Sequence, residues 1–475
     1  MAGRKRKNRA VRVIAGIIAA LALAVLALVL FVDIDTYRPG LETEASRVLG
    51  LDVKIRGEMK VEYFPPFGIS LADIHASRRG ATVIRVERVR AGLKILPLLW
   101  GRVRLREVEL FRPQLSLLRT GSGPFDFDRY LSRPFRTTRE ALPGTFDSLD
   151  RLSVSGGIVF YASKDSSFRA EVDGLELVMR DITFGRLPGE DPFRTVSFSG
   201  SVKAARAAIG AWEGSTLACE LTAKDGNYEI HPIALTAAGG TGKGSVWINL
   251  SVPTPLLHIR FSQESSDVGE LVTAAGGTPG LLEGNADISV NLFMKGNDPG
   301  ALAGTMTGDA SWKGNDLRVP GFDPDALLTE IRKGKSVPLS PIAALLLPGP
   351  LLPAAIEELS APDSAGENEG EVGLLSTLVS KWTITEGVFE AEDAAFATKS
   401  HRVALSGRID LPGGRFDNVT VAWVDEAGCA RAAQSIQGPF ARPRIAETGA
   451  AGGGKGPVPE GECEVFYAGS VPPPE

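Results

Sequence analysis

The sequence predicts a mainly β protein in which an N-terminal transmembrane helix precedes an elongated antiparallel β-sheet body with a few short helices. Three observations predict this fold class. An uncharged apolar run extends from Val13 to Val32, apolar and polar residues alternate with a period of two through much of the remaining chain, and Gly, Pro, Asn and Asp separate the alternating segments. With 43% hydrophobic and 23% charged residues among 475, the composition is that of a folded chain and not of a disordered or polytopic one.

The apolar run is long enough to cross a membrane, because twenty residues form a helix of about 30 Å, the thickness of the hydrocarbon core. A cleaved signal peptide would have a shorter apolar region and a small-x-small site, whereas this run ends in Phe31-Val32-Asp33. We therefore expect an uncleaved anchor. Basic residues before the run place the amino terminus in the cytoplasm and the rest of the chain across the membrane: Arg4, Lys5, Arg6, Lys7, Arg9 and Arg12.

A short helix is predicted from Asp35 to Gly50, with Asp35 or Thr36 as its cap and Pro39 in its first turn. Its apolar residues form one stripe: Leu41, Ala45, Val48 and Leu49. The pattern then changes to strict alternation, which predicts a half-buried antiparallel strand whose apolar side is formed by Val53, Ile55, Met59, Val61 and Tyr63.

The same alternation recurs along the chain and predicts about twenty strands. The clearest examples are residues 84–95, 175–179, 246–250, 257–261, 286–294, 403–405 and 419–423. Two helices are predicted among them, one from Asp323 to Gly334 and a shorter one over 373–381, with an acidic, Gly-rich linker over 361–373. The apolar segment 341–356 contains four prolines and is too interrupted to be a second membrane span.

These elements suggest seven regions. They are a cytoplasmic basic tail over 1–12, the transmembrane helix over 13–32, a helix with strands over 35–130, a β-rich body over 131–320, a helical segment with the acidic linker over 321–381, a C-terminal β region over 382–446, and a flexible tail over 447–475.

No motif for catalysis or cofactor binding stands out. The segment "GGTGKGS" over 239–245 lacks the glycine and the hydroxyl residue that a phosphate-binding loop requires, so a flexible turn between two strands is the better interpretation. The four histidines are scattered, and no serine lies in a Gly-x-Ser-x-Gly elbow. We expect no metal, no cofactor and no enzyme activity. The exported part is acidic once the basic tail is set aside, which argues against nucleic acid as a partner.

Two segments resemble the amino-terminal region of the AsmA family of bacterial envelope proteins: "DIDTYRPGLETEASRVLGLDVKIRGEMKVEYFPPFGISLADI" over 33–74 and "LKILPLLWGRVRLREVELFRPQLSLLR" over 93–119. The shared order is a helix ending in Leu-Gly, a strand carrying Gly57, a Pro-Pro-x-Gly turn, and a Leu-x-x-Leu-Pro-Leu-Leu-x-Gly segment followed by a strand ending in a proline. Weaker resemblance extends to 235–261, 428–445 and 463–472.

The resemblance implies an inner-membrane anchor, a periplasmic β-rich body shaped as an open groove, and a role in outer-membrane biogenesis and lipid homeostasis. Membrane phospholipids are then the expected partners, bound or guided along the apolar side of the groove. Candidates for its lining are Val53, Ile55, Val61, Leu93, Ile95, Ile288, Val290 and Leu292. An alternative is a non-catalytic scaffold, with its sheets closed on themselves, that holds envelope-assembly proteins. The sequence does not indicate an oligomeric state.

Two smaller features accompany the resemblance. Arg102, Arg104 and Arg106 project together and are candidates for contacts with anionic headgroups, or they form an ordinary solvated face. Val103 and Leu105 share one side of this strand but Val108 and Leu110 fall on the other, so either a bulge near Arg106 or Glu107 or a strand covered on both sides is expected. Cys429 and Cys463 lie in family-like motifs and are candidates for a disulfide, with free thiols as the alternative.

Overall fold

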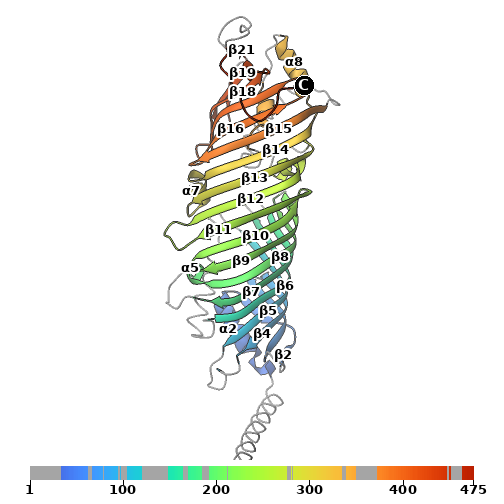
Figure 1. Cartoon of the computed structure of the whole chain (residues 1–475). Coiled ribbons are helices and arrows are strands. Elements are labelled where there is room, and N and C mark those ends of the chain that lie inside the picture. Colours follow the sequence, from blue (N-terminus) through green and yellow to red (C-terminus); the bar gives the residue numbers. More distant parts are fainter. Residues whose placement is uncertain are drawn as a thin grey trace, which may run out of the picture. The chain divides into compact units, whose positions relative to one another are not determined.

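The computed structural model of this chain is mainly β, as predicted, and is divided into two compact units (Figure 1). Unit 1 comprises Met1–Ser116 and Phe127–Ser155, and unit 2 comprises Leu117–Asp126 and Gly156–Glu475. The structure describes residues 34–62, 67–78, 80–94, 97, 104–119, 148–163, 169–184, 192–210, 212–274, 280, 282–333, 339–348, 372–446, 449–450 and 463–474.

The predicted anchor over 13–32 and its basic flank lie outside the described residues. Among the helices that the structure does describe, none has both the length and the apolar composition needed to cross a membrane. The anchor therefore stays a prediction from the sequence.

Unit 1 contains a short helical segment and an antiparallel sheet in which β1 and β2 both pair with β3, and β3 pairs with β4 and β4 with β5. The elements are η1 (Ile34–Tyr37), α2 (Arg38–Leu49), β1 (Asp52–Ile55), β2 (Met59–Glu62), β3 (Gly68–Arg78), β4 (Ala81–Leu93) and β5 (Leu105–Arg119), and β6 (Ser148–Ser163) begins in this unit.

Helix α2 confirms the predicted helix after the anchor, with Pro39 in its first turn and Gly50 in the left-handed conformation at its end. The predicted cap is wrong. Residues 34–37 form a 3-10 turn, Tyr37 occupies the cap position without a side-chain bond, and Asp35 instead pairs with Arg38. The apolar stripe does not face the sheet either, because Leu41 and Leu49 are exposed.

The face of α2 that meets the sheet is polar, and it satisfies the free edge of β1. Arg38, Glu42 and Ser46 recur every fourth residue, so they lie on one side of the helix. Arg38 Nη1 donates to the carbonyls of Ile55 and Gly57 at 2.6 and 2.8 Å, Glu42 accepts from Ile55 N at 2.8 Å, and Ser46 Oγ accepts from Val53 N at 2.9 Å. The bond from the Ile55 amide is the main cause that lowers the pKa of Glu42.

Unit 2 is built on a single antiparallel run in which each strand from β7 to β19 pairs with the next along the chain. The strands are β7 (Arg169–Thr183), β8 (Ser197–Ile209), β9 (Trp212–Lys224), β10 (Asn227–Ala237), β11 (Gly240–Asn249), β12 (Leu256–Asp267), β13 (Asn285–Lys295), β14 (Thr307–Pro320), β15 (Val372–Thr385), β16 (Val388–Ala397), β17 (Arg402–Asp410), β18 (Arg415–Val424) and β19 (Ala430–Pro439). The short strands β20 (Arg444–Ile445) and β21 (Gly449–Ala450) pair with β19 and cover its edge.

Several of these strands are bent by β-bulges, and Figure 1 shows the resulting curvature of the sheet. The pairing register shifts beside Asp181, Thr216, Ser265 and Asn418, and each of these residues has a positive φ. A bulge adds one residue to one strand of a pair, which bends that strand and increases its twist. The repeated bulges therefore curve the sheet of unit 2.

Short helices accompany the run of strands. They are α5 (Pro192–Thr195), α6 (Val268–Ala274), α7 (Pro299–Gly304), α8 (Pro324–Arg332) and α9 (Ser340–Ala344). Helix α8 confirms the prediction from Asp323 onward: the Asp323 carboxylate caps it by accepting from Asp325 N at 2.9 Å.

The helix predicted over 373–381 is wrong, because these residues belong to β15. The sheet is covered on both faces at this point, so Leu378 is buried in one core and Val379 in the other. Consecutive buried residues remove the period of two from the sequence and leave a spacing that resembles that of a helix.

Candidate functional site

One face of the unit 2 sheet is apolar across many strands, and we call it the apolar face. Direct register partners on adjacent strands form a continuous row on this face. From β10 to β18 its members are Ile230, Val246, Ile259, Leu292, Gly308, Ile384, Phe389, Ile409 and Phe416.

The exposure of this row changes along the sheet although its chemistry does not. Ile230, Val246 and Ile259 are only half-buried, Leu292 is 6% exposed, and the row from Ile384 to Phe416 is at most 1% exposed. These residues are register partners on one face of the sheet, and none has a polar side chain. The gradient in exposure therefore reflects what covers each strand and not the type of side chain. The apolar face is therefore fully covered over β15 to β18 and only partly covered over β10 to β12, and we call the partly covered region the open part.

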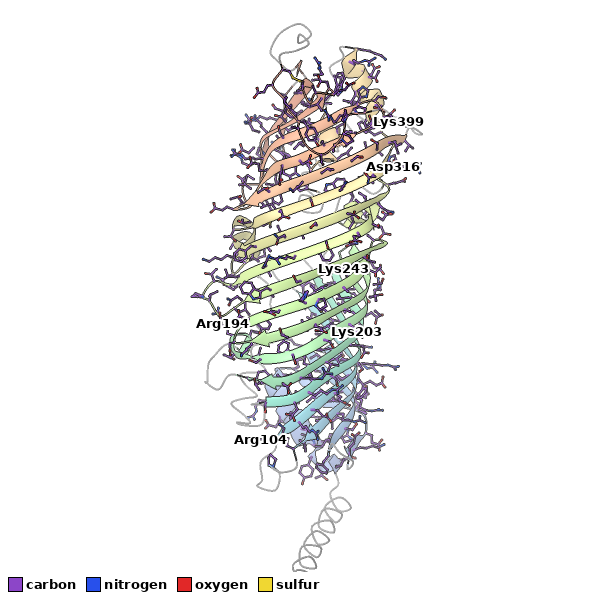
Figure 2. The ribbon with its side chains drawn as sticks, in the orientation of Figure 1. Arg104, Arg194, Lys203, Lys243, Asp316 and Lys399 are labelled. Carbon is purple, nitrogen blue, oxygen red and sulfur yellow. A yellow bond between two sulfur atoms is a disulfide. The ribbon has the colours of Figure 1, made fainter. Side chains whose placement is uncertain are left out.

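The open part is broader than one row. Other half-buried apolar side chains stand on the same face in neighbouring positions: Leu221, Ile248, Leu257, Phe261, Ile288 and Val290. The opposite face carries polar and charged side chains in the alternate positions, among them Lys203, Lys243 and Arg260, all of which are exposed (Figure 2). The two faces are thus separated as in a sheet with one side in water and the other against apolar material.

The glycines of "GGTGKGS" contribute to the open part, since Gly240 onward belongs to β11 and not to a flexible turn as predicted. A Cβ added at Gly242 would lie 2.7 Å from Phe261 Cζ, and one at Gly244 would lie 3.0 Å from its Cδ2. The glycines therefore leave room for the Phe261 ring to lie flat along the neighbouring strand.

The closed part is covered by residues 339–348, which include α9. Most of this segment is wholly buried against the apolar face, together with Trp382, Phe389 and Phe396 of the sheet. A second core lies on the opposite face of β15 to β18, where small side chains such as Ala395, Ala404 and Ala422 pack against Tyr467 and Val471.

Residues 463–474 form a strap over that second core. Cys429 and Cys463 form a disulfide with Cα atoms 5.9 Å apart, and Cys219 is free. Tyr467 donates to Asp393 Oδ1 at 2.6 Å and accepts from Val471 N at 3.0 Å, and burial of this hydroxyl raises the pKa of Tyr467. Closing the interval of 34 residues stabilises the folded chain by about 3 to 4 kcal/mol in the chain-entropy description.

The residues predicted to line a groove fall into two groups. Ile288, Val290 and Leu292 lie together on the apolar face of β13, where Ile288 and Val290 belong to the open part and Leu292 is buried. In unit 1, Val53 and Ile55 are buried at 3% and 6% exposure, whereas Val61 and Leu93 are half-buried. Ile95 lies outside the described residues.

Several lining residues were missed as site candidates, among them Ile230, Val246, Ile259 and Phe261. The alternation over 246–250 and 257–261 did predict the strands that carry most of them. It gave no indication of which end of the sheet would stay open, because the covered strands β17 and β18 show similar alternation over 403–405 and 419–423.

The basic segment of β5 is exposed. Arg104 and Arg106 both face solvent (Figure 2 labels Arg104), and among the described residues neither forms an ion pair; Arg102 is not described. Gly92 pairs with Glu107 and Leu93 with Leu105, so Arg106 is the extra residue of a bulge. The bulge expected near Arg106 is confirmed.

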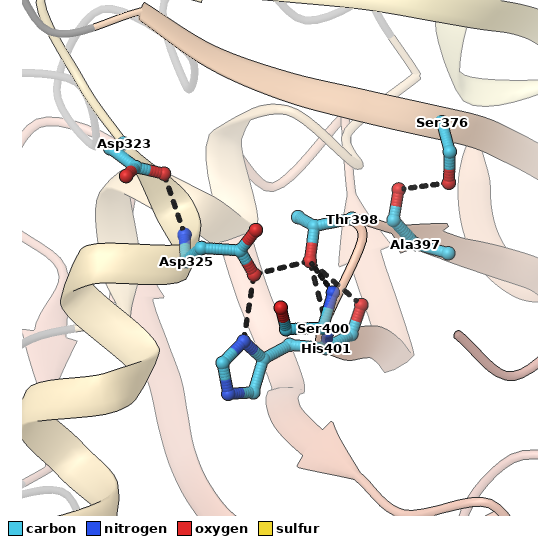
Figure 3. A network of polar contacts seen from close by, with 7 residues as sticks. All are labelled: Asp323, Asp325, Ser376, Ala397, Thr398, Ser400 and His401. Atoms are coloured by element: carbon cyan, nitrogen blue, oxygen red, sulfur yellow. Dashed lines mark hydrogen bonds and ion pairs between the residues drawn. The ribbon is translucent and has the colours of Figure 1, made fainter. Parts of the chain in front are cut away.

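A polar network joins α8 to the turn between β16 and β17 (Figure 3). His401, 5% exposed, contacts Asp325 Oδ1 through Nδ1 at 2.7 Å, and Thr398 Oγ1 donates to the same carboxylate oxygen. The Thr398 hydroxyl thus bonds to the carboxylate and not to the imidazole, which is not the arrangement of a nucleophile beside its base. Among the described residues no group of His, Cys, Asp and Glu could hold a metal ion. The network fastens a helix end to the sheet.

Comparison with known proteins gives one match. Neither a curated protein nor a solved structure matches the chain. The model of the AsmA family matches residues 4–215, a range that covers the anchor segment, the described part of unit 1 and the strands up to the start of β9. The amino-terminal part of the chain, residues 4–215, therefore belongs to the AsmA family.

Proposed function

We propose that this protein binds lipid acyl chains on the open part of its apolar face, while residues 13–32 anchor it in a bacterial inner membrane and hold the β-rich body in the periplasm. In this role it supports outer-membrane biogenesis and lipid homeostasis without catalysing a reaction. The observation that carries the proposal is the row from Ile230 to Phe416, which has no polar side chain along its length but is only half-buried at one end.

The energetics favour an apolar ligand over water at this surface. At about 0.8 kcal/mol per CH₂, moving a sixteen-carbon chain from a bilayer into water costs roughly 13 kcal/mol, so a carrier needs a continuous apolar surface. The strands that carry the open part, β9 to β13, extend roughly 19 Å at a spacing of about 4.8 Å. The hydrocarbon of one leaflet is about 15 Å thick, so an acyl chain fits along the open part.

The exposed arginines supply a second, weaker argument. Arg104 and Arg106 could meet anionic headgroups, which guanidinium groups bind well through paired hydrogen bonds. They are a candidate contact on unit 1 for the anionic headgroups of a membrane surface. The photo-crosslinking experiment on β11 described below tests the apolar face alone, so its result does not depend on these arginines.

A non-catalytic scaffold for envelope-assembly proteins is the second candidate. The closed part of unit 2 favours it, because β15 to β18 are covered on both faces along most of their length. In that case the open part would bind a protein segment in place of a lipid.

Photo-crosslinking from neighbouring positions on β11 distinguishes the two candidates. A photoreactive residue at Val246 of the full-length chain points to the apolar face, and one at Lys243 points to the opposite face. We expect phospholipid adducts from position 246 and none from 243. Protein adducts from 246 without lipid would favour the scaffold, and the absence of lipid adducts from 246 would contradict the proposed function.

A further inference from the structure

The segment that covers the apolar face is held by specific hydrogen bonds as well as by apolar packing. Ser380 Oγ donates to the Leu346 carbonyl at 2.8 Å, and Trp312 Nε1 donates to the Leu347 carbonyl at 3.2 Å. At the other end, Leu339 N donates to Gln434 Oε1 at 2.7 Å. Buried backbone groups need such partners, so the sheet is built to receive residues 339–348 in this position.

The apolar side chains of this segment fill the space above the sheet. Leu339, Ile342, Ala343, Leu346 and Leu347 are all 0% exposed and belong to the same core as the sheet residues beneath them. Displacing the segment would expose these side chains to water and break the three hydrogen bonds at once. It is therefore a fixed part of unit 2.

The boundary between the open and covered parts lies at β14. A second row of register partners runs through Gln263, Ile288, Trp312, Ser380, Ala394, Leu405, Val421 and Gln434. Gln263 is 3% exposed because its side-chain amide donates to the Ala237 carbonyl, Ile288 and Trp312 are half-buried, and Ser380 is wholly buried. The Trp312 indole, bonded to the Leu347 carbonyl, stands where the open surface ends.

We infer that residues 339–348 are an acyl-chain stop: a chain bound along the open part ends against Trp312 and Leu347 and does not pass onto β15. This inference rests on the proposed function and makes it more specific. The apolar face then binds a lipid of limited chain length, because the surface available to the acyl chain ends at β14. A bound lipid must leave by another route than along β15 to β19.

The test uses the full-length chain and phosphatidylethanolamine with a diazirine at the tip of one acyl chain. After irradiation, mass spectrometry identifies the labelled peptides. We expect label on the peptides of β10 to β14 and around Leu347, at least about tenfold above label on Phe389 and Leu405. The variant Leu347→Ala removes the end wall, and its label should extend to Ser380 and Trp382. Val471→Ala is the matched control, because it truncates a buried side chain in the core on the opposite face.

The outcomes separate the stop from the function on which it rests. Equal labelling of β10 to β13 and of β16 and β17 in the unaltered chain would overturn the stop and leave lipid binding in place. No label on either region would overturn both. The comparison of label on β10 to β13 with label on β16 and β17 is made in the unaltered chain. The test therefore does not depend on the folding of Leu347→Ala.

Discussion

Replacing Ile259 with aspartate should lower the phospholipid bound to the full-length chain at least about tenfold, which corresponds to about 1.4 kcal/mol of binding free energy. Ile259 lies on the open part of the apolar face between Val246 and Leu292, where a bound chain would contact it. An ionised carboxylate placed against hydrocarbon loses its water without gaining a partner, and that penalty is several kcal/mol. Bound lipid is measured by extraction and mass spectrometry of the purified variant.

The adjacent residue provides the control. Arg260→Asp introduces the same carboxylate on the opposite, exposed face of β12. Lipid content should stay close to that of the unaltered chain. An equal loss in both variants would mean that a carboxylate anywhere on β12 disturbs the fold, and no loss in either would remove the apolar face from consideration as the lipid site.

The largest effect on stability is expected from Phe389→Ala. Phe389 is 0% exposed in the main core of unit 2, and truncating such a residue leaves a cavity that lowers the free energy of unfolding by about 3 to 5 kcal/mol. Phe293→Ala is the same substitution on the opposite face of β13, where the ring is 42% exposed and contacts His258 edge to face. It should cost no more than about 1.5 kcal/mol.

Denaturant unfolding of unit 2, followed by the fluorescence of buried tryptophans such as Trp382, measures both variants. A similar loss for Phe389→Ala and Phe293→Ala would contradict the division of the sheet into a covered part and an exposed opposite face.

Strands β11 to β13 could be predicted well because each has one apolar and one polar side. The alternation at Val246 and Ile248, at Leu257 and Ile259, and along β13 matches the faces that the structure assigns to them. The prediction failed over 373–381, where both faces are buried and the alternation disappears.

The extent of the open surface could not be predicted, for a different physical reason. It depends on where residues 339–348 pack, and that packing joins Leu339 to Gln434, 95 residues away in the chain. Periodicity reports which face of a strand is apolar but not what covers it. In the same way, the helix after the anchor was predicted from the sequence. Its contact with β1 through Arg38, Glu42 and Ser46 was not, because these side chains bond to backbone groups at the edge of β1.

The most direct test of the central claim is the amount of phospholipid that remains with the full-length chain after purification from membranes in mild detergent. Extraction followed by quantitative mass spectrometry gives the molar ratio of lipid to protein, and Ile259→Asp purified in parallel gives the background from the detergent and the anchor segment. If the open part of the apolar face binds acyl chains, the unaltered chain will retain phospholipid near a simple molar ratio and well above that background. A ratio indistinguishable from the background would contradict the account.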